Sequence, residues 1–247
     1  MNRLKKLISE LNFLLQFNSI FKIFEFVIKK IKGKQNTIKI KIFNNHIILR
    51  TNPSDLKTLK NNMTDEFDFL KDEKFKNINT IYDCGSFIGG SVIKFSKLFP
   101  NSKIYSYEPN NENFELLKKN TEFIKNIKIN NLAISNVVAQ NQLYGSEKGV
   151  CSYTLIKNDN NYIIQNIQSS TIENEMKKNG NKFIDLIKID IEGSEFKIFE
   201  NEKILNFLGI IVIEIHKSDD KDYLIKKILK YKKNCLEENK YEKFIFF

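Results

Sequence analysis

The first 31 residues repeat apolar side chains at steps of three and four positions. These apolar positions are Leu4, Leu7, Ile8, Leu11, Leu14, Leu15, Phe21, Phe24, Ile28 and Ile31. The period predicts one or two amphipathic helices that end at Gly33. We expect the core or a second subunit, as in a homodimer, to cover the apolar stripe, because an exposed stripe of this size promotes aggregation. The five lysines of the segment leave a helix on a membrane surface as the alternative.

A different pattern follows, in which every second residue is apolar. Ile38, Ile40 and Ile42 alternate with other residues, Asn44-Asn45 offers a turn, and an apolar run at 47–49 continues the pattern. This predicts a β-hairpin over residues 38–51. The sequence Pro53-Ser54-Asp55 then predicts the start of a helix that runs toward Met63. We assign residues 1–79 to an N-terminal extension of helix and hairpin, and residues 80–247 to the main domain.

Strands and helices alternate from Thr80 to the end of the chain. The predicted strands are 80–84, 103–108, 127–134, 183–189, 209–215 and 244–247. The predicted helices are 91–98, 113–123, 171–178, 194–206 and 219–232, with a capping box over residues 170–173. Residues 137–165 form a looser stretch with short β-like runs. The alternation predicts an α/β fold whose mostly parallel sheet carries helices on both faces.

Composition narrows the class of protein. Of the 247 residues 41% are hydrophobic, and no apolar segment reaches the ~18 residues that a membrane span needs. The net charge is +10, but the lysines are scattered instead of forming one basic tract, so we expect no nucleic-acid partner and no stable membrane insertion. Cys84, Cys151 and Cys235 are widely spaced, which favours reduced packing residues over a disulfide or a zinc site. The N-terminus lacks the apolar core of a signal peptide, and we expect a cytoplasmic protein.

Three of the nine glycines fall within six positions, directly after the strand predicted at 80–84. Their spacing is Gly85-x-x-x-Gly89-Gly90, and Asp83 precedes them. A dinucleotide fold would place G-x-G-x-x-G before a pyrophosphate, which a carboxylate here would repel. S-adenosyl-L-methionine (SAM), with its sulfonium and amino groups, suits that carboxylate better. The next strand ends at Glu108, whose carboxylate can accept the ribose hydroxyls of an adenosyl cofactor.

Polar side chains also end two later strands of the predicted sheet. Asp190 and Glu192 follow the strand 183–189, and Glu214 and His216 lie at the end of the strand 209–215. Function gathers at the carboxyl ends of parallel strands, so we expect these groups to lie near the cofactor. His216 and Asp190 are the candidate bases that would take the proton of a hydroxyl acceptor, and His216 is favoured for its near-neutral intrinsic pKa. The alternative is that the three carboxylates and the imidazole bind a divalent cation such as Mg²⁺.

These residues make the chain resemble the FkbM family of SAM-dependent methyltransferases. The segment 83–89, Asp-Cys-Gly-Ser-Phe-Ile-Gly, is similar to its D-x-G-A-N-I-G motif, and 108–120 is similar to E-P-x-x-x-N-F-x-x-L-x-x-N. The segment 184–195 is close to I-D-L-I-K-I-D-V-E-G-A-E, Ile213 to His216 resembles the V-x-E-x-H strand end, and Arg50 with Ser54-Asp55 resembles an R…S-D segment. Ser86-Phe87 in place of Ala-Asn, and Gly90, depart from the pattern.

The resemblance implies the class I methyltransferase (Rossmann-like) fold, with a seven-stranded sheet, and methyl transfer to a hydroxyl. Expected cofactor-binding residues are Asp83, Gly85, Ser86, Phe87, Gly89, Glu108, Pro109, Ala133 and Asp190. Expected catalytic residues are His216, Asp190 and Glu192, with no metal.

The family points to a sugar or nucleotide-activated sugar as acceptor, in bacterial surface-polysaccharide (capsule) synthesis. Three other functions are weighed. A nucleic-acid methyltransferase would carry a [DNS]-P-P-[YFW] motif, but the only prolines are Pro53, Pro100 and Pro109. A non-catalytic scaffold is disfavoured because the strand-end acids are intact. A nicotinamide dehydrogenase is disfavoured by the glycine spacing.

Overall fold

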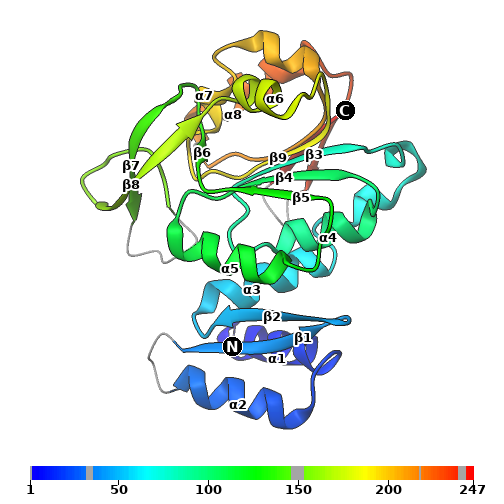
Figure 1. Cartoon of the computed structure of the whole chain (residues 1–247), viewed down its shortest axis with the longest axis vertical. Helices are drawn as coiled ribbons and strands as arrows, with labels where there is room; N and C mark the ends of the chain where they lie inside the picture. Colours follow the sequence, from blue (N-terminus) through cyan, green and yellow to red (C-terminus); the bar gives the residue numbers. More distant parts are fainter. Residues whose placement is uncertain (1, 32–35, 146–152, 217, 239–242) are drawn as a thin grey trace.

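The strands from Thr80 onward form a seven-stranded sheet in the order β11-β12-β10-β9-β3-β4-β5 (Figure 1). This computed structural model describes residues 2–31, 36–145, 153–216, 218–238 and 243–247. The predicted helix end at Gly33 and the second of the three cysteines, Cys151, lie outside the described residues. β10, β9, β3, β4 and β5 pair in parallel, whereas β12 is antiparallel to both β10 and β11. The predicted α/β class with a mostly parallel seven-stranded sheet is confirmed.

The strands of the main sheet have the following bounds: β3 Thr80–Cys84, β4 Lys103–Tyr107, β5 Ile127–Asn130, β9 Ile184–Ile189, β10 Leu208–Glu214, β11 Cys235–Glu238 and β12 Lys243–Phe246. The edge strand β11 is not among the predicted strands. Its sequence, Cys-Leu-Glu-Glu, is short and half charged, so it lacks the apolar run that marks the buried parallel strands.

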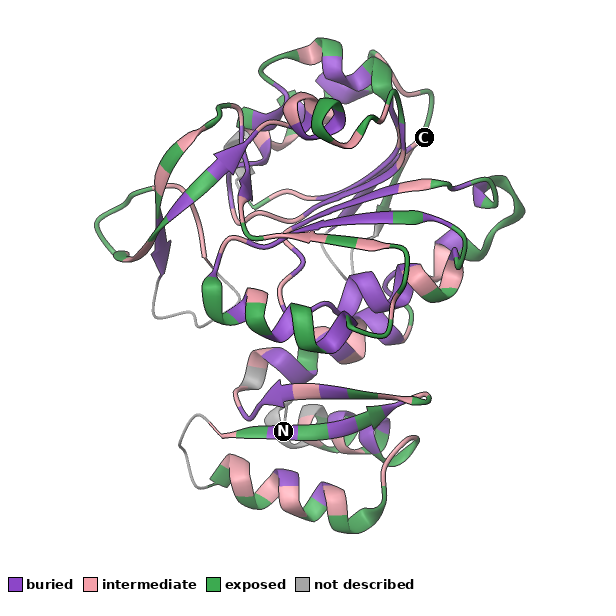
Figure 2. Ribbon diagram, viewed as in Figure 1, coloured by how far each residue is buried: buried purple, intermediate pink, exposed green. Residues whose placement is uncertain are grey.

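Alternate side chains of each strand supply the two cores of a three-layer fold. Tyr82 and Ile187 belong to the core beneath α6 (Ile172–Asn179), α7 (Glu195–Ile198) and α8 (Ser218–Leu229). Ile81 and Leu186 belong to the core on the opposite face, which α4 (Gly90–Leu98) helps to cover. Figure 1 shows α4 and α5 (Asn111–Thr121) on one side of the sheet and α6, α7 and α8 on the other. Helices on both faces are as predicted, and the buried strands run through the centre of Figure 2.

The N-terminal extension is built from α1 (Asn2–Leu15), α2 (Ile20–Ile31), the hairpin β1 (Thr37–Ile42) and β2 (Asn45–Arg50), and α3 (Pro53–Met63). Ile42 pairs with Asn45, so the turn residues are Phe43 and Asn44, one position earlier than predicted. The buried isoleucines of β1 pack in one core with Phe26 of α2, Met63 of α3 and Leu116 of α5. The extension and the main domain are therefore joined by shared core packing.

The apolar stripe predicted in α2 does not face the core, which α2 contacts through buried residues outside that stripe. Ile23 and Phe26 of α2 are buried against the hairpin, whereas Phe21, Phe24 and Ile31 are exposed. The chain's own fold thus leaves one face of α2 bare, and its burial by a second subunit stays a prediction. Among the described residues, no helix combines the length and the apolarity that crossing a bilayer requires.

The predicted strand 127–134 is wrong in one respect, because the chain leaves the main sheet within it. β5 ends at Asn130, and β6 (Ala133–Ile134) joins a separate three-stranded sheet with β8 (Tyr162–Ser170) and β7 (Ala139–Gly145). The Asn131 side chain donates to the carbonyl oxygens of Glu108 and Pro109, at 3.0 and 3.1 Å. These bonds hold the chain beside the end of β4 while it changes sheets. The looser stretch of the sequence therefore contains two long strands, β7 and β8.

Two helix predictions also need correction. The predicted helix 194–206 is two pieces, α7 and a 3-10 segment over Glu202–Phe207, because Asn201 is extended and its side chain accepts from the Lys203 N–H to start a new turn. The cap of α6 is Thr171, which accepts from the Asn174 N–H at 3.1 Å. Ser170, the predicted cap, still belongs to β8 and hydrogen-bonds to the Glu175 carboxylate instead.

Asn120 of α5 ties the extension to the main domain. Its amide donates to the carbonyl oxygens of Ile48 and Ile88, both at 3.0 Å, and accepts from the Ile48 N–H at 2.7 Å. Asn120 is fully buried, so the bonds have no competition from solvent.

We predict that Asn120→Ala lowers the free energy of unfolding by about 2–4 kcal/mol, because it leaves buried backbone groups without partners. Urea denaturation followed by circular dichroism measures the change. The control is Asn126→Ala, whose exposed amide makes one 3.5 Å contact with Pro100. The urea midpoint of Asn126→Ala should equal that of the unaltered protein. Equal midpoints for Asn120→Ala and Asn126→Ala would show that the Asn120 hydrogen bonds do not stabilise the fold.

Candidate active site

A cavity of about 500 Å³ opens at the carboxyl ends of β3, β4, β9 and β10. Most of the predicted site residues line it: Gly85, Ser86, Phe87, Glu108, Pro109, Ala133, Asp190, Glu192 and His216. One further wall comes from α3, through Lys57, Thr58, Asn61 and Asn62. The extension therefore contributes to the same cavity as the main domain.

The glycine turn is held against the neighbouring strands by its own backbone. The N–H groups of Gly85 and Ser86 donate to the Tyr107 carbonyl oxygen of β4, at 3.0 and 3.1 Å. Gly85 has φ +82°, and a Cβ there would lie 1.8 Å from the Asp190 carbonyl oxygen. Only glycine fits, because β3 and β9 approach so closely at their ends. Gly90 is similar, since a Cβ would meet the Asn62 amide oxygen of α3 at 2.3 Å.

Asp83 and Gly89 are the two predicted cofactor residues that are not among those lining the cavity. Asp83 is fully buried beneath the turn, where it accepts a hydrogen bond from the Ser91 hydroxyl of α4. Its other oxygen lies 3.4 Å from the Lys188 ammonium. Asp83 thus anchors the start of α4 and balances a buried cation. Direct contact of Asp83 or Gly89 with a cofactor stays a prediction.

Glu108 ends β4 and sits at the cavity wall. Its Oε2 accepts from the Phe87 N–H at 2.9 Å, and its Oε1 accepts from the Asn110 N–H at 3.0 Å and the Asn113 amide at 3.3 Å. Burial raises the pKa of Glu108 to about 7, while these hydrogen bonds act in the opposite direction. A carboxylate offers about four acceptor positions, so these three bonds leave one for a ligand hydroxyl.

Arg50 of the extension stabilises the part of the cavity wall around Glu108. Its guanidinium donates to both oxygens of Asp55, at 3.1 and 3.0 Å, and to the Asn113 amide oxygen at 2.8 Å. The same group lies 5.4 Å from the ring centre of Phe87. Arg50 therefore fixes both Asn113 and Phe87, which are two of the partners of Glu108. The sequence shows the R…S-D segment but not this connection, because Asn113 lies 63 positions away.

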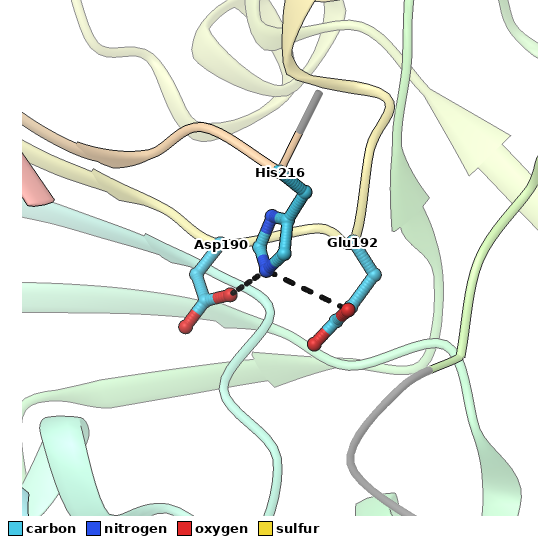
Figure 3. A group of neighbouring side chains, drawn as sticks. All are labelled: Asp190, Glu192 and His216. Atoms are coloured by element: carbon cyan, nitrogen blue, oxygen red, sulfur yellow. Dashed lines mark ion pairs between the residues drawn. The ribbon is translucent and has the colours of Figure 1, made fainter. Parts of the chain in front are cut away.

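The cluster at the ends of β9 and β10 centres on His216. Its Nδ1 lies 2.8 Å from Glu195 Oε1, and its Nε2 lies 3.2 Å from Glu214 Oε1. Glu192 and Asp190 oxygens are 3.5 and 3.9 Å from Nε2, and Figure 3 shows both carboxylates beside the ring. Burial alone would lower the pKa of His216, but the surrounding carboxylates raise it to about 11. The imidazole is therefore protonated at neutral pH and donates from both nitrogens.

Glu192 and Asp190 differ although both face His216. Burial raises the pKa of Glu192 to about 7, with His216 acting in the opposite direction. Burial would also raise the pKa of Asp190, but Lys188 and Lys243 hold it well below the usual range. Near neutral pH, Glu192 can thus accept a proton while Asp190 stays ionised.

Lys188 and Lys243 are the site residues that sequence reasoning missed. Lys188 Nζ donates to the Gly85 carbonyl oxygen at 2.8 Å and lies 3.5 Å from Asp190. Lys243 Nζ lies 2.7 Å from Glu214, 3.2 Å from Glu66 and 3.7 Å from Asp190. A signal for Lys188 was present, since a lone lysine inside the apolar run of β9 has to be paired. Glu195 was likewise visible in the matched segment 184–195, without an assigned role.

The same cluster contains a set of metal-ligand atoms. One ligand atom each from Asp190, Glu192 and His216 lies within 4.8 Å of the others. His216 would have to be neutral to bind through Nε2, with its Nδ1–H donated to Glu195, as metal-bound histidines commonly donate their other N–H to a carboxylate. The residues therefore allow the divalent-cation alternative, but only if His216 loses the proton that makes it an imidazolium.

Comparison with known proteins identifies the family. The family model described as "Methyltransferase FkbM domain" matches residues 83–241, which is more than half of the chain. A search of curated proteins found no match.

Three solved structures illustrate the similarity in fold. A precorrin-6y C5,15-methyltransferase from Geobacter metallireducens is 12% identical, with 74% of this chain and 87% of that chain covered and a TM-score of 0.43. An rRNA methylase from Streptococcus thermophilus is 12% identical, with 73% and 91% covered and a TM-score of 0.43. TYW2 from M. jannaschii, in complex with AdoMet, is 12% identical, with 87% and 84% covered and a TM-score of 0.42.

These TM-scores lie below 0.5, so the assignment rests on the family match and on the residues that it spans. That match begins at Asp83, includes the glycine turn, and extends beyond His216. The chain belongs to the FkbM methyltransferase family, and it is a SAM-dependent methyltransferase with S-adenosyl-L-methionine as its cofactor.

Proposed function

We propose that the protein methylates a hydroxyl of a sugar or of a nucleotide-activated sugar, in the synthesis of a bacterial surface polysaccharide. The observation that carries the proposal is one cavity lined both by the glycine turn with Glu108 and by the carboxylate–imidazole cluster. The two groups adjoin, because Gly85 packs against the Asp190 backbone. Cofactor-binding and proton-accepting groups side by side in one cavity are what methyl transfer to a hydroxyl requires.

The residues around the glycine turn, Glu108 and Asp190 fit SAM. A cavity of about 500 Å³ lies within the range of small-molecule sites. Glu108 has an acceptor position left for a ribose hydroxyl, and Pro109 and Ala133 border the same wall. Carboxylates outnumber the cations around Asp190, which suits a ligand that carries a sulfonium and an amino group. When bound, SAM supplies a methyl group that is activated for attack by an oxygen nucleophile.

Glu192 is the group best placed to take the proton of the acceptor. The sequence favours His216 or Asp190, but the surroundings of these residues favour other roles. His216 is held as an imidazolium by Glu195 and Glu214, so it cannot take the proton of the acceptor and instead places a positive charge beside Glu192. Asp190 stays ionised beside Lys188 and Lys243 and contributes negative charge near the cofactor. Glu192 lines the cavity, and its pKa of about 7 matches a general base at neutral pH.

The α3 wall supports a polyhydroxylated acceptor. Lys57, Thr58, Asn61 and Asn62 bring ammonium, hydroxyl and amide groups to the cavity. Such side chains donate and accept hydrogen bonds, as sugar hydroxyls do. The positions after β9 read Asp-Ile-Glu-Gly, without the paired prolines that hold a flipped base in many nucleic-acid amino methyltransferases. Both observations favour a sugar over a base as the acceptor.

A panel assay tests the proposed function. Purified protein with SAM should form S-adenosylhomocysteine when nucleotide-activated sugars are added, and not with DNA or tRNA. Product analysis should locate the new methyl group on a hydroxyl. Turnover with nucleic acid alone would refute the acceptor class. Loss of turnover with a chelator and recovery with Mg²⁺ would favour the cation over Glu192 as the activating group.

We predict that Glu108→Ala weakens SAM binding about 10–100-fold, because it removes a charge-assisted acceptor worth about 1.5–3 kcal/mol. The dissociation constant of Glu108→Gln, which keeps one carbonyl acceptor, should lie between those of the unaltered protein and Glu108→Ala. Isothermal titration calorimetry measures the dissociation constants. Glu115→Ala, on the exposed side of α5, is the matched control. An unchanged constant in a folded Glu108→Ala protein would exclude the ribose assignment.

We predict that the turnover rate rises with pH up to about 7 and then levels off. Because the pKa of Glu192 is raised to about 7, the fraction of Glu192 in its ionised, active form increases as the pH rises through that value. Glu192→Gln should abolish this rise and lower turnover by roughly 10²–10⁴, with SAM affinity within threefold of the unaltered value. Initial rates between pH 5.5 and 8.5 provide the profile. If the rise persists in Glu192→Gln and disappears in His216→Gln, His216 is the base.

A further inference from the structure

The helix α2 carries two apolar faces, and only one of them is used. Ile23 and Phe26 pack into the hairpin core. On the other side lie Ile20, Phe21, Phe24, Ile28 and Ile31, which are 69%, 82%, 66%, 37% and 78% exposed. With 3.6 residues per turn, these five side chains fall within an arc of about 100°. We call them the outer face of α2. Figure 1 places α2 at the end of the molecule farthest from the main sheet.

The size of the outer face argues against a protein partner that uses this face alone. With 150–250 Å² for a fully exposed aromatic side chain, the five exposed fractions amount to roughly 550 Å² of apolar surface. That equals the largest apolar patch of an ordinary monomer, about 300–600 Å². A standard interface buries about 800 Å² on each partner. A dimer held only by two outer faces would therefore fall short of a stable contact.

The charges around the outer face favour an anionic surface. The charged side chains that the structure describes around α2 are three lysines, Lys22, Lys29 and Lys30, and two glutamates, Glu10 and Glu25. Both acidic residues are paired with lysines of α2: Glu25 lies 2.6 Å from Lys22 and 2.7 Å from Lys29, and Glu10 lies 3.5 Å from Lys30. The remaining charge is positive. A symmetric pair of α2 helices would bring like charges together, whereas a bilayer with anionic lipids attracts them.

We infer that α2 binds the surface of an anionic lipid bilayer. The helix lies parallel to the surface, with Phe21 and Phe24 inserted among the acyl chains and the lysines at the level of the phosphates. A short helix with aromatic side chains on one face and lysines beside them is the pattern of interfacial helices, which lie on a membrane without spanning it. Because α3 separates α2 from the cavity, the bound protein keeps its active site in the aqueous phase.

Vesicle sedimentation with the full-length protein tests this inference. Vesicles of phosphatidylcholine with 30% phosphatidylglycerol should sediment most of the protein, whereas pure phosphatidylcholine should sediment at least tenfold less. The double variant Phe21→Ser/Phe24→Ser should reduce the bound fraction at least tenfold. Raising the salt to 0.5 M should reduce it as well, because the lysine contribution is screened.

The matched control is Phe183→Ser/Phe207→Ser, which also removes two exposed phenyl rings but from the amino ends of β9 and β10 in the main domain. Their exposures are 44% and 48%. This control should sediment like the unaltered protein, and all variants should bind SAM with unchanged affinity. Binding that survives Phe21→Ser/Phe24→Ser would overturn the inference. The inference would also be overturned if the unaltered protein did not bind vesicles. In that case, a dimer found by light scattering and converted to a monomer by Phe21→Ser/Phe24→Ser would identify a second subunit as the partner of α2.

Discussion

The buried ammonium of Lys188 is the interaction on which the site depends. It comes from the middle layer of the fold, donates to the Gly85 carbonyl oxygen, and stands between the carboxylates of Asp83 and Asp190. A buried cation without partners would cost several kcal/mol, so these three groups are fixed relative to one another. The strand ends themselves are joined by the Asp190 N–H, which donates to the Cys84 carbonyl oxygen at 3.1 Å, and at this approach only glycine fits at position 85. The glycine turn is as much a requirement of this packing as of any ligand.

The protonation states of the cluster follow from how its charges are distributed. Lys188 and Lys243 both lie beside Asp190, which therefore stays ionised. Among the described residues, Glu192 forms no ion pair with a lysine, and burial raises its pKa to about 7. His216 lies between Glu195 and Glu214 and holds its proton. Two neighbouring carboxylates beside one imidazolium thereby differ in protonation, and the positions of Lys188 and Lys243 decide which carboxylate stays ionised.

The sequence predicts much of this arrangement, and its failures have physical causes. The parallel strands were found because each is an apolar run that ends in a polar group, and their ends do meet at one cavity. β11 was missed because an edge strand needs no apolar run. The change of sheet at Asn131 was missed because it depends on contacts with the end of β4. The different pKa shifts of Asp190 and Glu192 could not be predicted, since Lys243 reaches Asp190 from a strand 53 positions later and burial is a property of the fold.

The N-terminal extension belongs to the functional unit, although it precedes the glycine turn in the chain. Arg50 reaches from β2 to Asn113, and Asn113 in turn donates to Glu108. Asn62 of α3 packs against Gly90 and hydrogen-bonds to Glu66, which pairs with Lys243. Side chains of residues 1–79 thus hold both Glu108 and Lys243, which line the cavity. The proposed membrane helix α2 belongs to the same packed unit, because Ile23 and Phe26 share a core with the hairpin and α3. Contact with a bilayer through α2 would therefore act on a packed support of the cavity wall.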